Sequence, residues 1–345
     1  MTTTDDASPG RSTRPTIVDV ARRAGVSKSL VSLVLRGQPG ASEANRAAVL
    51  RAADELGYRA NAAARALAAQ RTHTVGAILS DLRNPWFIDL LASVRAELTA
   101  HGLTLFLSED FGLEKDASVL DAFVEARVDG LLCLGTLPPA AHLLTTARTL
   151  PTVVAAGREP DLPNVDVVTG DDRAGAARAI EHLVSLGHRR IAHLAGTGRA
   201  ADLRAEGYRD EMRRHGLDGL ILVEVSDRSE EGDRTAAMAL LSRDPRPTAI
   251  LANNDYAAVI TMSLAQTLGL ETPADVSVVG YDNSYLARIG YIGLTTLDNN
   301  YTDMGKLAVQ RLITRIAEPD AARTVTLLDP TLQPRKTSAA VPAVT

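Results

Sequence analysis

Short apolar runs recur along most of this chain at intervals of roughly 20–30 residues, and this repeat restricts the fold more than any other feature. Amphipathic stretches of helical length separate the runs, and glycines such as Gly102 and Gly187 close several of these stretches. Repeated β-α units of this length predict parallel sheets that are covered by helices. The runs lie at residues 75–79, 103–107, 130–134, 152–156, 165–169, 191–195, 220–225, 249–252 and 276–280.

The runs form two series, and the second series restarts at residue 165. Two series predict two Rossmann-like α/β subdomains rather than one long sheet. Residues 294–313, LTTLDNNYTDMGKLAVQRLI, then predict a crossover strand and a final helix that returns to the first subdomain. The tail after Pro334 holds no leucine heptads, so we expect no added tetramerisation helix.

The stretch before these runs, residues 16–56, reads as three short helices with a tight turn between the first two. Thr16 and Asp19 have the spacing of a capping box, Gly25-Val26 supplies the turn, and Ser27 and Ser42 can cap the second and third helices. The predicted apolar faces are Val20, Ala21 and Ala24, then Val31, Val34 and Leu35, then Val49, Leu50, Ala53 and Leu56. Together these features predict an all-α helix-turn-helix unit, the kind of motif whose second helix enters the major groove of DNA.

Charge favours DNA binding over the alternative, a plain three-helix bundle with a solvated second helix. Residues 1–73 hold 11 lysines and arginines against 6 acidic residues, a net charge of +5, while the whole chain carries −5. The remaining residues therefore carry −10. A basic N-terminal unit on an acidic body is typical of a DNA-binding module joined to a domain that does not bind DNA.

The rest of the composition limits the function classes. The chain has 345 residues, 45% of them hydrophobic, and a single cysteine, Cys133, within an apolar run, so we expect no disulfide framework. There is no transmembrane-length apolar run, and the polar N-terminus is no signal peptide, which predicts a cytoplasmic protein. His182, His188 and His193 do not share one face, and no metal-ligand spacing or nucleotide-binding motif is present, so we expect no metal, no cofactor and no enzymatic activity.

The N-terminal residues also resemble a known family. The segments DVARRAGVS, SLVLRG, SEANRAAVLRAADELGY and NAAARAL are similar to the headpiece of the lactose-repressor/galactose-repressor (LacI/GalR) transcription factors, and the resemblance extends to about Leu328. It implies a homodimer that binds a pseudo-palindromic operator, and a periplasmic-binding-protein-like body that holds a small polar effector, expected to be a sugar or sugar derivative. Effector binding would change the affinity for DNA. The alternatives are a solute-binding protein and an enzyme on a Rossmann-like body.

With this resemblance the chain divides into five parts. We expect a disordered tail at 1–13, a headpiece at 14–59, a hinge helix and linker at 60–73, an effector-binding and dimerisation domain at 74–332, and a tail at 333–345. Within the large domain, the first subdomain would comprise about 74–168 plus 298–332, and the second 169–297.

The hinge segment, residues 61–70, is short and alanine-rich, so it needs a partner to be a stable helix. In the family two such helices pack together in the minor groove, where a leucine wedges between base pairs, and Leu67 occupies that position. Asn61 and Ala64 would contact DNA beside it. The alternative is a solvated linker helix with Leu67 on the body. Ala60 departs from the family, which usually has proline there.

The resemblance also assigns the headpiece residues that read DNA. Lys28 and Ser29 occupy the two base-reading positions, and a lysine there can donate to guanine. Leu33 stands where many members have arginine, so it contacts a thymine methyl or packs inward, and the operator should differ from that of arginine-bearing relatives. The full predicted set is Thr16, Ser27, Lys28, Ser29, Ser32 and Leu33, with Asn61, Ala64 and Leu67 from the hinge.

Ligands of open parallel sheets bind beyond the carboxyl ends of the strands, so the side chains there are the candidates for an effector site. The first strand is followed by Ser80 and Asn84, which can form hydrogen bonds, and by Trp86 and Phe87, which can stack on a ring. These residues resemble the first effector-contact segment of the family. Core packing at a helix start is the alternative for the two aromatic residues.

The later strands add four more candidates. Arg204 matches the ligand-binding arginine of the family, unless it pairs with Asp202 or Glu206 on its own helix. Asn254, Asp255 and Asp282 follow the next two strands, where either aspartate could instead cap a helix. In the loop 226–232 many members carry an aromatic residue, whereas this chain has Asp227 and Arg228, which leaves room for an effector more polar than a neutral hexose.

Overall fold

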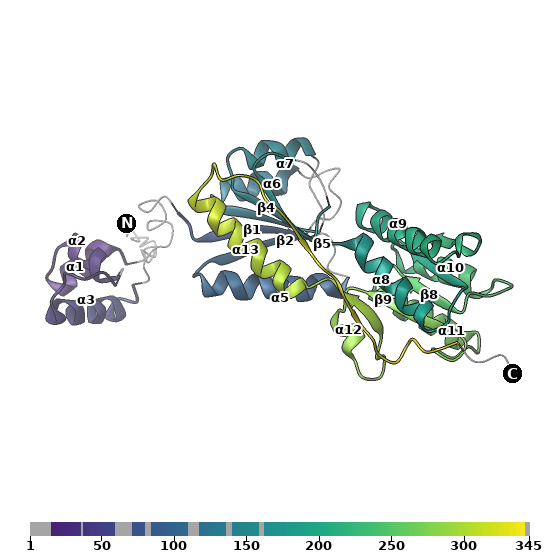
Figure 1. Ribbon diagram of the computed structural model, residues 1–345. Coiled ribbons are helices and arrows are strands. Elements are labelled where there is room, and N and C mark those ends of the chain that lie inside the picture. Colours follow the sequence, from purple (N-terminus) through teal and green to yellow (C-terminus); the bar gives the residue numbers. More distant parts are fainter. Residues whose placement is uncertain are drawn as a thin grey trace, which may run out of the picture. The chain divides into compact units, whose positions relative to one another are not determined.

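The computed structural model describes residues 15–35, 37–58, 71–79, 84–109, 117–135, 140–158 and 162–341. It separates into two compact units, residues 1–72 and 73–345. The first unit contains the predicted headpiece, and the second contains the predicted α/β body (Figure 1). The N-terminal tail 1–13 and the hinge residues Asn61, Ala64 and Leu67, for which the sequence makes predictions, lie outside the described residues.

The headpiece consists of three helices, α1 (Ile17–Ala24), α2 (Lys28–Leu35) and α3 (Glu43–Glu55). Thr16 and Asp19 form the expected capping box, and Gly25 adopts the left-handed conformation, φ 66°, that ends α1 and starts the turn. Ser27 Oγ accepts a hydrogen bond from Leu30 N at 3.2 Å, and Ser42 caps α3 in the same way. These local contacts fix the helix boundaries at the predicted residues.

A small apolar core holds the three helices together. Val20, Val31 and Val49, one from each helix, are completely buried at its centre. Leu50 is 51% exposed, so its assignment to the apolar face of the third helix was wrong. Only the i, i+3 and i+4 neighbours of Val49 can share its face of α3, and Leu50, one residue further along, points elsewhere.

The body contains two six-stranded sheets. In spatial order, the strands of the first sheet are β11 (Val325–Leu328), β5 (Val165–Gly170), β4 (Thr152–Ala155), β3 (Gly130–Leu134), β1 (Thr74–Leu79) and β2 (Thr104–Glu109). Those of the second are β12 (Thr331–Gln333), β10 (Thr295–Asp298), β9 (Ser277–Tyr281), β8 (Ala249–Ala252), β6 (Ile191–Ala195) and β7 (Leu222–Val225). Every neighbouring pair is parallel except β10 and β12.

Helices cover both faces of each sheet, as the alternating pattern predicted (Figure 1). On the first sheet, α5 (Pro85–Ala100) and α13 (Tyr301–Ala317) cover one face, and α6 (Ala117–Glu125) and α7 (Ala140–Ala147) cover the other. On the second sheet, α8 (Asp172–Ser185) and α9 (Arg199–Arg214) lie opposite α10 (Glu230–Leu241), α11 (Asp255–Thr267) and the short α12 (Tyr285–Arg288). A 3₁₀ turn, η1 (Asp218–Leu220), precedes β7.

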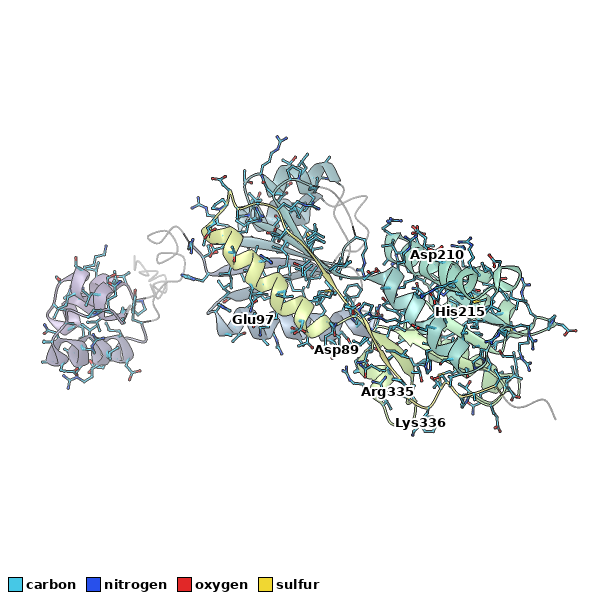
Figure 2. All side chains as sticks on the ribbon, in the orientation of Figure 1. Asp89, Glu97, Asp210, His215, Arg335 and Lys336 are labelled. Atoms are coloured by element: carbon cyan, nitrogen blue, oxygen red, sulfur yellow. The ribbon has the colours of Figure 1, made fainter. Side chains whose placement is uncertain are left out.

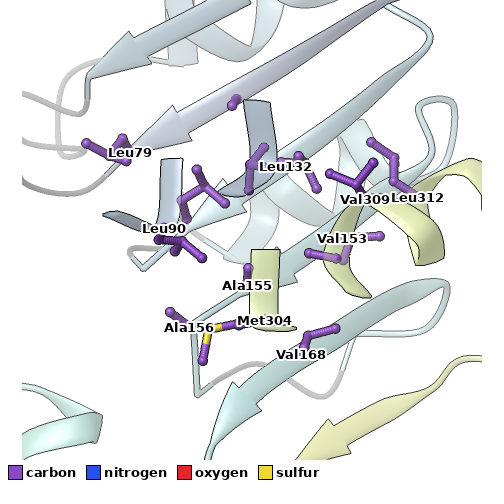
Figure 3. Packing of buried hydrophobic residues seen from close by; sticks show 14 of the residues in the cluster. Leu79, Leu90, Leu132, Val153, Ala155, Ala156, Val168, Met304, Val309 and Leu312 are labelled. Carbon is purple, nitrogen blue, oxygen red and sulfur yellow. The ribbon is translucent and has the colours of Figure 1, made fainter. Parts of the chain in front are cut away.

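The core of the first subdomain shows why its strands read as unbroken apolar runs. Leu79, Leu132 and Val153 come from three neighbouring strands and pack against Leu90 of α5 and Val309 of α13 (Figure 3). A strand that is covered on both faces has no solvent face on which to place polar residues. Because Val309 of α13 belongs to this core, the final helix returns to the first subdomain, as the sequence of residues 294–313 predicted.

Two strands near the C-terminus are absent from the sequence-based prediction. β11 lies at the edge of the first sheet and β12 at the edge of the second, and side chains along both are partly exposed. Edge strands of this kind lack a continuous apolar run, which is why the sequence does not reveal them. In the segment predicted as a tail, 333–345, the chain continues along the second subdomain, where Thr337 exchanges hydrogen bonds with Val278.

The chain therefore passes between the two subdomains three times, after β5, after β10 and after β11. Asp89 on α5, labelled in Figure 2, adds a contact between them, because its carboxylate accepts hydrogen bonds from Tyr285 N and Arg288 Nη2 of α12, both at 3.1 Å. The subdomains are thus linked both by the chain and by side chains.

Candidate functional site

A cavity of about 330 Å³ lies where the carboxyl ends of strands from both sheets meet. Its volume is at the lower end of the range of pockets that hold small molecules. Each lining segment follows a strand, which is where open parallel sheets place their ligands. The lining residues are Asn84, Trp86, Phe87, Gly135, Ala156, Arg158, Thr197, Ala200, Ala201, Arg204, Arg228, Glu230, Asp233, Asn253, Asn254, Tyr256, Asp282 and Asn299.

Two arginines share one buried carboxylate at the base of this pocket. Asp172, at the first turn of α8, accepts from Arg158 Nε at 2.5 Å through Oδ2 and from Arg204 Nε at 2.9 Å through Oδ1. The Asp172 side chain is completely buried, and the two arginine side chains are 7% and 9% exposed. Arg158 follows β4 of the first sheet and Arg204 lies on α9 of the second subdomain, so this ion-pair cluster spans both.

Arg204 is fixed on several sides. Its Nη1 donates to the carbonyl oxygen of Asn253, and its guanidinium carbon lies 3.7 Å from the ring centroid of Tyr281. Although burial opposes a charged side chain, the carboxylates of Asp172 and Asp282 raise the pKa of Arg204. The arginine thus stays charged, and it pairs with neither Asp202 nor Glu206, the alternative that its own helix offered.

Asp282 presents a carboxylate with weak protein contacts. Burial raises its pKa to about 8, partly offset by Arg204, whose Nη2 lies 3.8 Å from Asp282 Oδ1. Asn84 Nδ2 and Asn299 Nδ2 approach its two oxygens at 3.5 Å each. A buried carboxylate with long hydrogen bonds retains the capacity to accept from the hydroxyl groups of a ligand.

An aromatic wall borders the same cavity. Trp86 and Phe87 at the start of α5 meet edge to face, with ring centroids 4.9 Å apart. Trp86 Nε1 donates to Asn299 Oδ1 at 2.7 Å, which fixes the orientation of the indole. Both rings also contact the apolar core of the first subdomain, so the two predicted roles, ligand contact and core packing, are compatible.

The structure brings most of the predicted effector residues together. Among the eight candidates, Asn84, Trp86, Phe87, Arg204, Asn254 and Asp282 line the cavity. Ser80 lies outside the described residues. In the loop after β7, Arg228 lines the rim, whereas Asp227 turns back to accept from Ser229 N.

Asp255 requires a correction. It is completely buried, and its carboxylate accepts from Ser284 N at 2.7 Å and from the hydroxyl groups of Ser284 and Thr296. It lies outside the cavity lining, and it does not cap α11 either, because Asn254 does so through Ala257 N. Asp255 instead joins α11 to the segments that follow β9 and form β10, a contact between distant parts of the chain that no local pattern indicates.

Sequence reasoning missed Arg158, Asp172 and Asn299. Arg158 sits in a polar loop among other charged residues, and Asp172 follows another aspartate, Asp171, that serves as the helix cap. Asn299 follows a strand, so the rule that found Asn84 and Asp282 could have found it too. The pairing of Arg158 with Asp172 depends on the path of the chain between the subdomains, so the sequence pattern gives no indication of it.

The headpiece places its candidate DNA contacts at the start of α2. Lys28 and Ser29 are exposed there, and Ser32 and Leu33 are half-buried. Thr16 and Ser27 are exposed too, but their hydroxyl groups also cap α1 and α2. Arg23 pairs with Glu55 of α3 at 2.6 Å, which ties the first and third helices together behind α2.

The histidines are structural in their contacts. His193 is completely buried and bonds to the carbonyl oxygen of Leu251, and His188 lies between Thr248 and Ala339. Burial lowers the pKa of each, that of His193 to about 4. Across the described ranges, no cluster of three or more histidines, cysteines or acidic residues could hold a metal ion. No helix in the same ranges is long and apolar enough to cross a membrane.

Comparison with known proteins agrees with both units. The family described as "Bacterial regulatory proteins, lacI family" matches residues 16–61, and the "Periplasmic binding protein-like domain" matches residues 180–338. The ribose operon repressor of Escherichia coli K12 is 35% identical over 326 residues, which cover 93% of this chain and 98% of that protein.

Two further comparisons point the same way. The transcriptional regulator GalR of Escherichia coli K12 is 31% identical over 335 residues, covering 95% and 97% of the two chains. The crystal structure of the lac repressor dimer bound to operator and an anti-inducer superposes with a TM-score of 0.83 at 27% identity, covering 95% of this chain and 100% of that one.

Proposed function

From the premise that the chain belongs to the LacI family of bacterial regulatory proteins, we propose that it represses transcription until a sugar-like effector occupies the cavity of the body. The protein is a DNA-binding transcriptional regulator rather than an enzyme. The observation that carries the effector part is the cavity itself, which collects arginine, carboxylate, amide and aromatic side chains at the strand ends of two subdomains.

The DNA-binding half of the proposal rests on the headpiece. Lys28 and Ser29 project from the first turn of α2, where their side chains can reach base edges in the major groove. The backbone N–H groups of the same turn favour a phosphate. We propose a homodimer in which two headpieces bind the half-sites of a pseudo-palindromic operator, with Leu67 of each hinge wedged into the minor groove. Its place of action would be the cytoplasm.

The effector half rests on the chemistry of the cavity. Asp282 can accept hydrogen bonds from hydroxyl groups, the amides of Asn84 and Asn254 can both donate and accept, and Trp86 offers a flat apolar face. This combination suits a compact polyhydroxylated ring. Because a ribose operon repressor is among the similar proteins, we propose a sugar of pentose or hexose size.

Coupling between the two halves follows from the position of the cavity. A ligand that contacts Trp86 of the first subdomain and Asp282 of the second favours one relative arrangement of the two. If DNA binding favours another arrangement, the ligand and the operator oppose each other through linkage. The three chain crossings between the subdomains would act as hinges for the change.

Trp86 makes the proposal testable, because it is the single tryptophan of the chain and lines the cavity. Neutral pentoses and hexoses should be titrated while the fluorescence of Trp86 is recorded, and each sugar that binds should then be added to the protein on its selected operator. We expect a saturable fluorescence change with at least one sugar and a loss of operator affinity with the same sugar. Saturable binding that leaves operator affinity unchanged would contradict the regulatory role of the cavity.

A further inference from the structure

Three arginines line the cavity, so the first question about its ligand is whether it carries a negative charge. Arg158, Arg204 and Arg228 would suit a sugar phosphate or a sugar acid if their guanidinium groups were available. The same lining, however, holds the three carboxylates of Glu230, Asp233 and Asp282, and Asp172 lies directly behind it. With all these groups ionised, the acidic side chains outnumber the arginines.

The two buried arginines have little left to offer an anion. Arg204 uses Nε for Asp172 and Nη1 for the carbonyl of Asn253. Arg158 likewise uses Nε for Asp172 and Nη1 for the carbonyl of Ala156. A carboxylate or phosphate is best held by two neighbouring nitrogens of one guanidinium group. In both groups Asp172 accepts the single hydrogen of Nε, so the Nε–Nη2 edge cannot act as such a fork, and on the other edge Nη1 already donates one of its two hydrogens to a backbone carbonyl.

Arg228, at the rim, does not change this balance. It is exposed, and two acidic residues, Glu230 and Asp233, follow it into the same lining. Asp233 is 4% exposed, and its pKa is raised by burial and by Asp227, with Arg228 acting against that shift. The positive charge of Arg228 is therefore countered locally. The sequence of this loop leaves room for an effector more polar than a neutral hexose, but the surroundings of Arg228 do not favour an anionic one.

We propose that Asp172 determines the specificity of the cavity, restricting it to uncharged polyhydroxylated ligands by occupying both buried guanidinium groups. This inference rests on the proposed function of the cavity as an effector site. Asp172 itself lies behind the two arginines and acts as a positioning residue. One Nη2 of each arginine remains for a ligand hydroxyl oxygen, and Asp282 can accept from hydroxyl groups, whereas an anion would meet two guanidinium groups whose charge Asp172 already offsets.

The test compares a neutral sugar with anions, with Trp86 fluorescence as the readout for the full chain. The probes are D-ribose, D-ribose 5-phosphate, D-ribonate and inorganic phosphate, all at one pH and constant ionic strength. Ribonate is close to ribose in size but open-chain, whereas ribose 5-phosphate keeps a sugar ring, so only a loss of affinity shared by both anionic sugars is attributed to charge. In the wild-type chain we expect both anionic sugars to bind on the order of 100-fold more weakly than ribose, and phosphate to give no saturable change.

Asp172→Asn should shift the preference towards anions. The substitution removes the negative charge and leaves one acceptor oxygen for the two arginines, so we expect a saturable response to inorganic phosphate and a ribose-to-ribonate affinity ratio that falls by about tenfold or more. Asp171→Asn is the matched control. It removes a neighbouring carboxylate that caps α8 without touching either arginine, and asparagine caps a helix equally well. Asp172→Glu keeps the charge and should keep the preference for ribose.

The outcomes separate this inference from the proposed function. Tight binding of ribonate or phosphate to the wild-type chain overturns the inference, even if Asp172→Asn does not fold. An equal shift in the Asp171→Asn control, or an unchanged ratio in a folded Asp172→Asn chain, overturns the role of Asp172. If no neutral sugar binds, the proposed sugar effector is wrong, and the phosphate titration still decides whether the cavity rejects anions.

Discussion

Asp282 combines a buried carboxyl group with a backbone conformation that is unusual for aspartate. Its backbone lies at φ 117°, a region that favours glycine, and its carboxylate is buried with three long contacts. Backbone strain and poor solvation at one residue are common in ligand-binding sites. The hydroxyl groups of an effector would form short hydrogen bonds with the carboxyl group of Asp282, which has only long contacts within the protein. Effector binding would therefore offset the free-energy cost of burying this group.

This cost has a pH dependence that can be measured. The pKa of Asp282 is about 8 in the folded chain against an ordinary 3.8, and burial raises that of Asp255 to about 6. Through these two carboxyl groups the folded chain binds more protons than the unfolded one, but below about pH 6.5 the lowered pKa values of His188 and His193 have the opposite effect. The free energy of unfolding should therefore fall as the pH rises from about 6.5 to 8, where Asp282 alone loses its proton. Urea unfolding should show Asp282→Asn losing much of this decline, on the order of a few kcal/mol. Parallel curves for the two chains would contradict the assignment.

Lys28 is the residue at which base recognition should be most sensitive. Its side chain is exposed at the start of α2 and can donate to guanine N7 and O6. Lys28→Ala should relax the base preference at one position of each half-site and cost about 1–3 kcal/mol of discrimination. Selection of binding sites from random DNA measures this preference. Arg22→Ala is the control, because Arg22 pairs with Asp19 on α1, and the sequence predicts that it contacts phosphates or lies on the solvated surface; an equal change in base preference would reject the assignment.

At the level of single residues, the site could be predicted where chemistry follows local position. Asn84 and Asp282 were found because each follows a strand, and the carboxyl ends of parallel strands meet at one edge. Asp172 could not be found in this way. Its partners stand 14 and 32 positions away in sequence, and only the passage of the chain from one subdomain to the other brings them to the same carboxylate.

The elements were predictable for a related reason. Strands buried on both faces produce apolar runs, so β1, β3, β4 and β6 stand near their predicted positions. The edge strands β2 and β7 still contain apolar runs and were predicted, whereas β11 and β12 are short and interrupted by polar residues, so they were missed, and the segment after β12 read as a tail. Burial, more than intrinsic propensity, decides which elements a sequence reveals.

The segment after β12 should therefore be important for stability. Thr337 is 2% exposed, and its hydroxyl group donates to Val278 O at 2.6 Å and accepts from Thr295 N at 2.9 Å. Thr337→Val keeps the shape but leaves both backbone groups buried without that partner, which should cost about 1–3 kcal/mol. Chemical unfolding of Thr331→Val, an exposed threonine in β12, provides the comparison and should stay within about 0.5 kcal/mol of wild type. Equal losses in the two variants would show that Thr337 has no special role.

The two parts of the chain carry net charges of opposite sign, positive in residues 1–73 and negative in the rest. The basic residues of 1–73 stand against a net −10 in the rest of the chain, so the headpiece attracts DNA while the body repels it. Operator affinity should accordingly fall steeply with salt, because each phosphate contact releases counterions. Effector affinity should change little, because an uncharged ligand releases none.

Reciprocity between the two sites gives the decisive test at this scale. If an effector lowers operator affinity by some factor, the operator must lower effector affinity by the same factor. Trp86 lies in the body, so its fluorescence reports effector binding with and without operator DNA. We expect operator DNA to weaken effector binding to the full chain by about 5- to 150-fold, the usual range of such coupling.

Removal of residues 1–72, a separate compact unit, should abolish this effect while the affinity measured without DNA is retained. If operator DNA weakened effector binding to the truncated chain as well, the DNA would be acting on the body directly, and the headpiece could not be the route by which the two sites communicate.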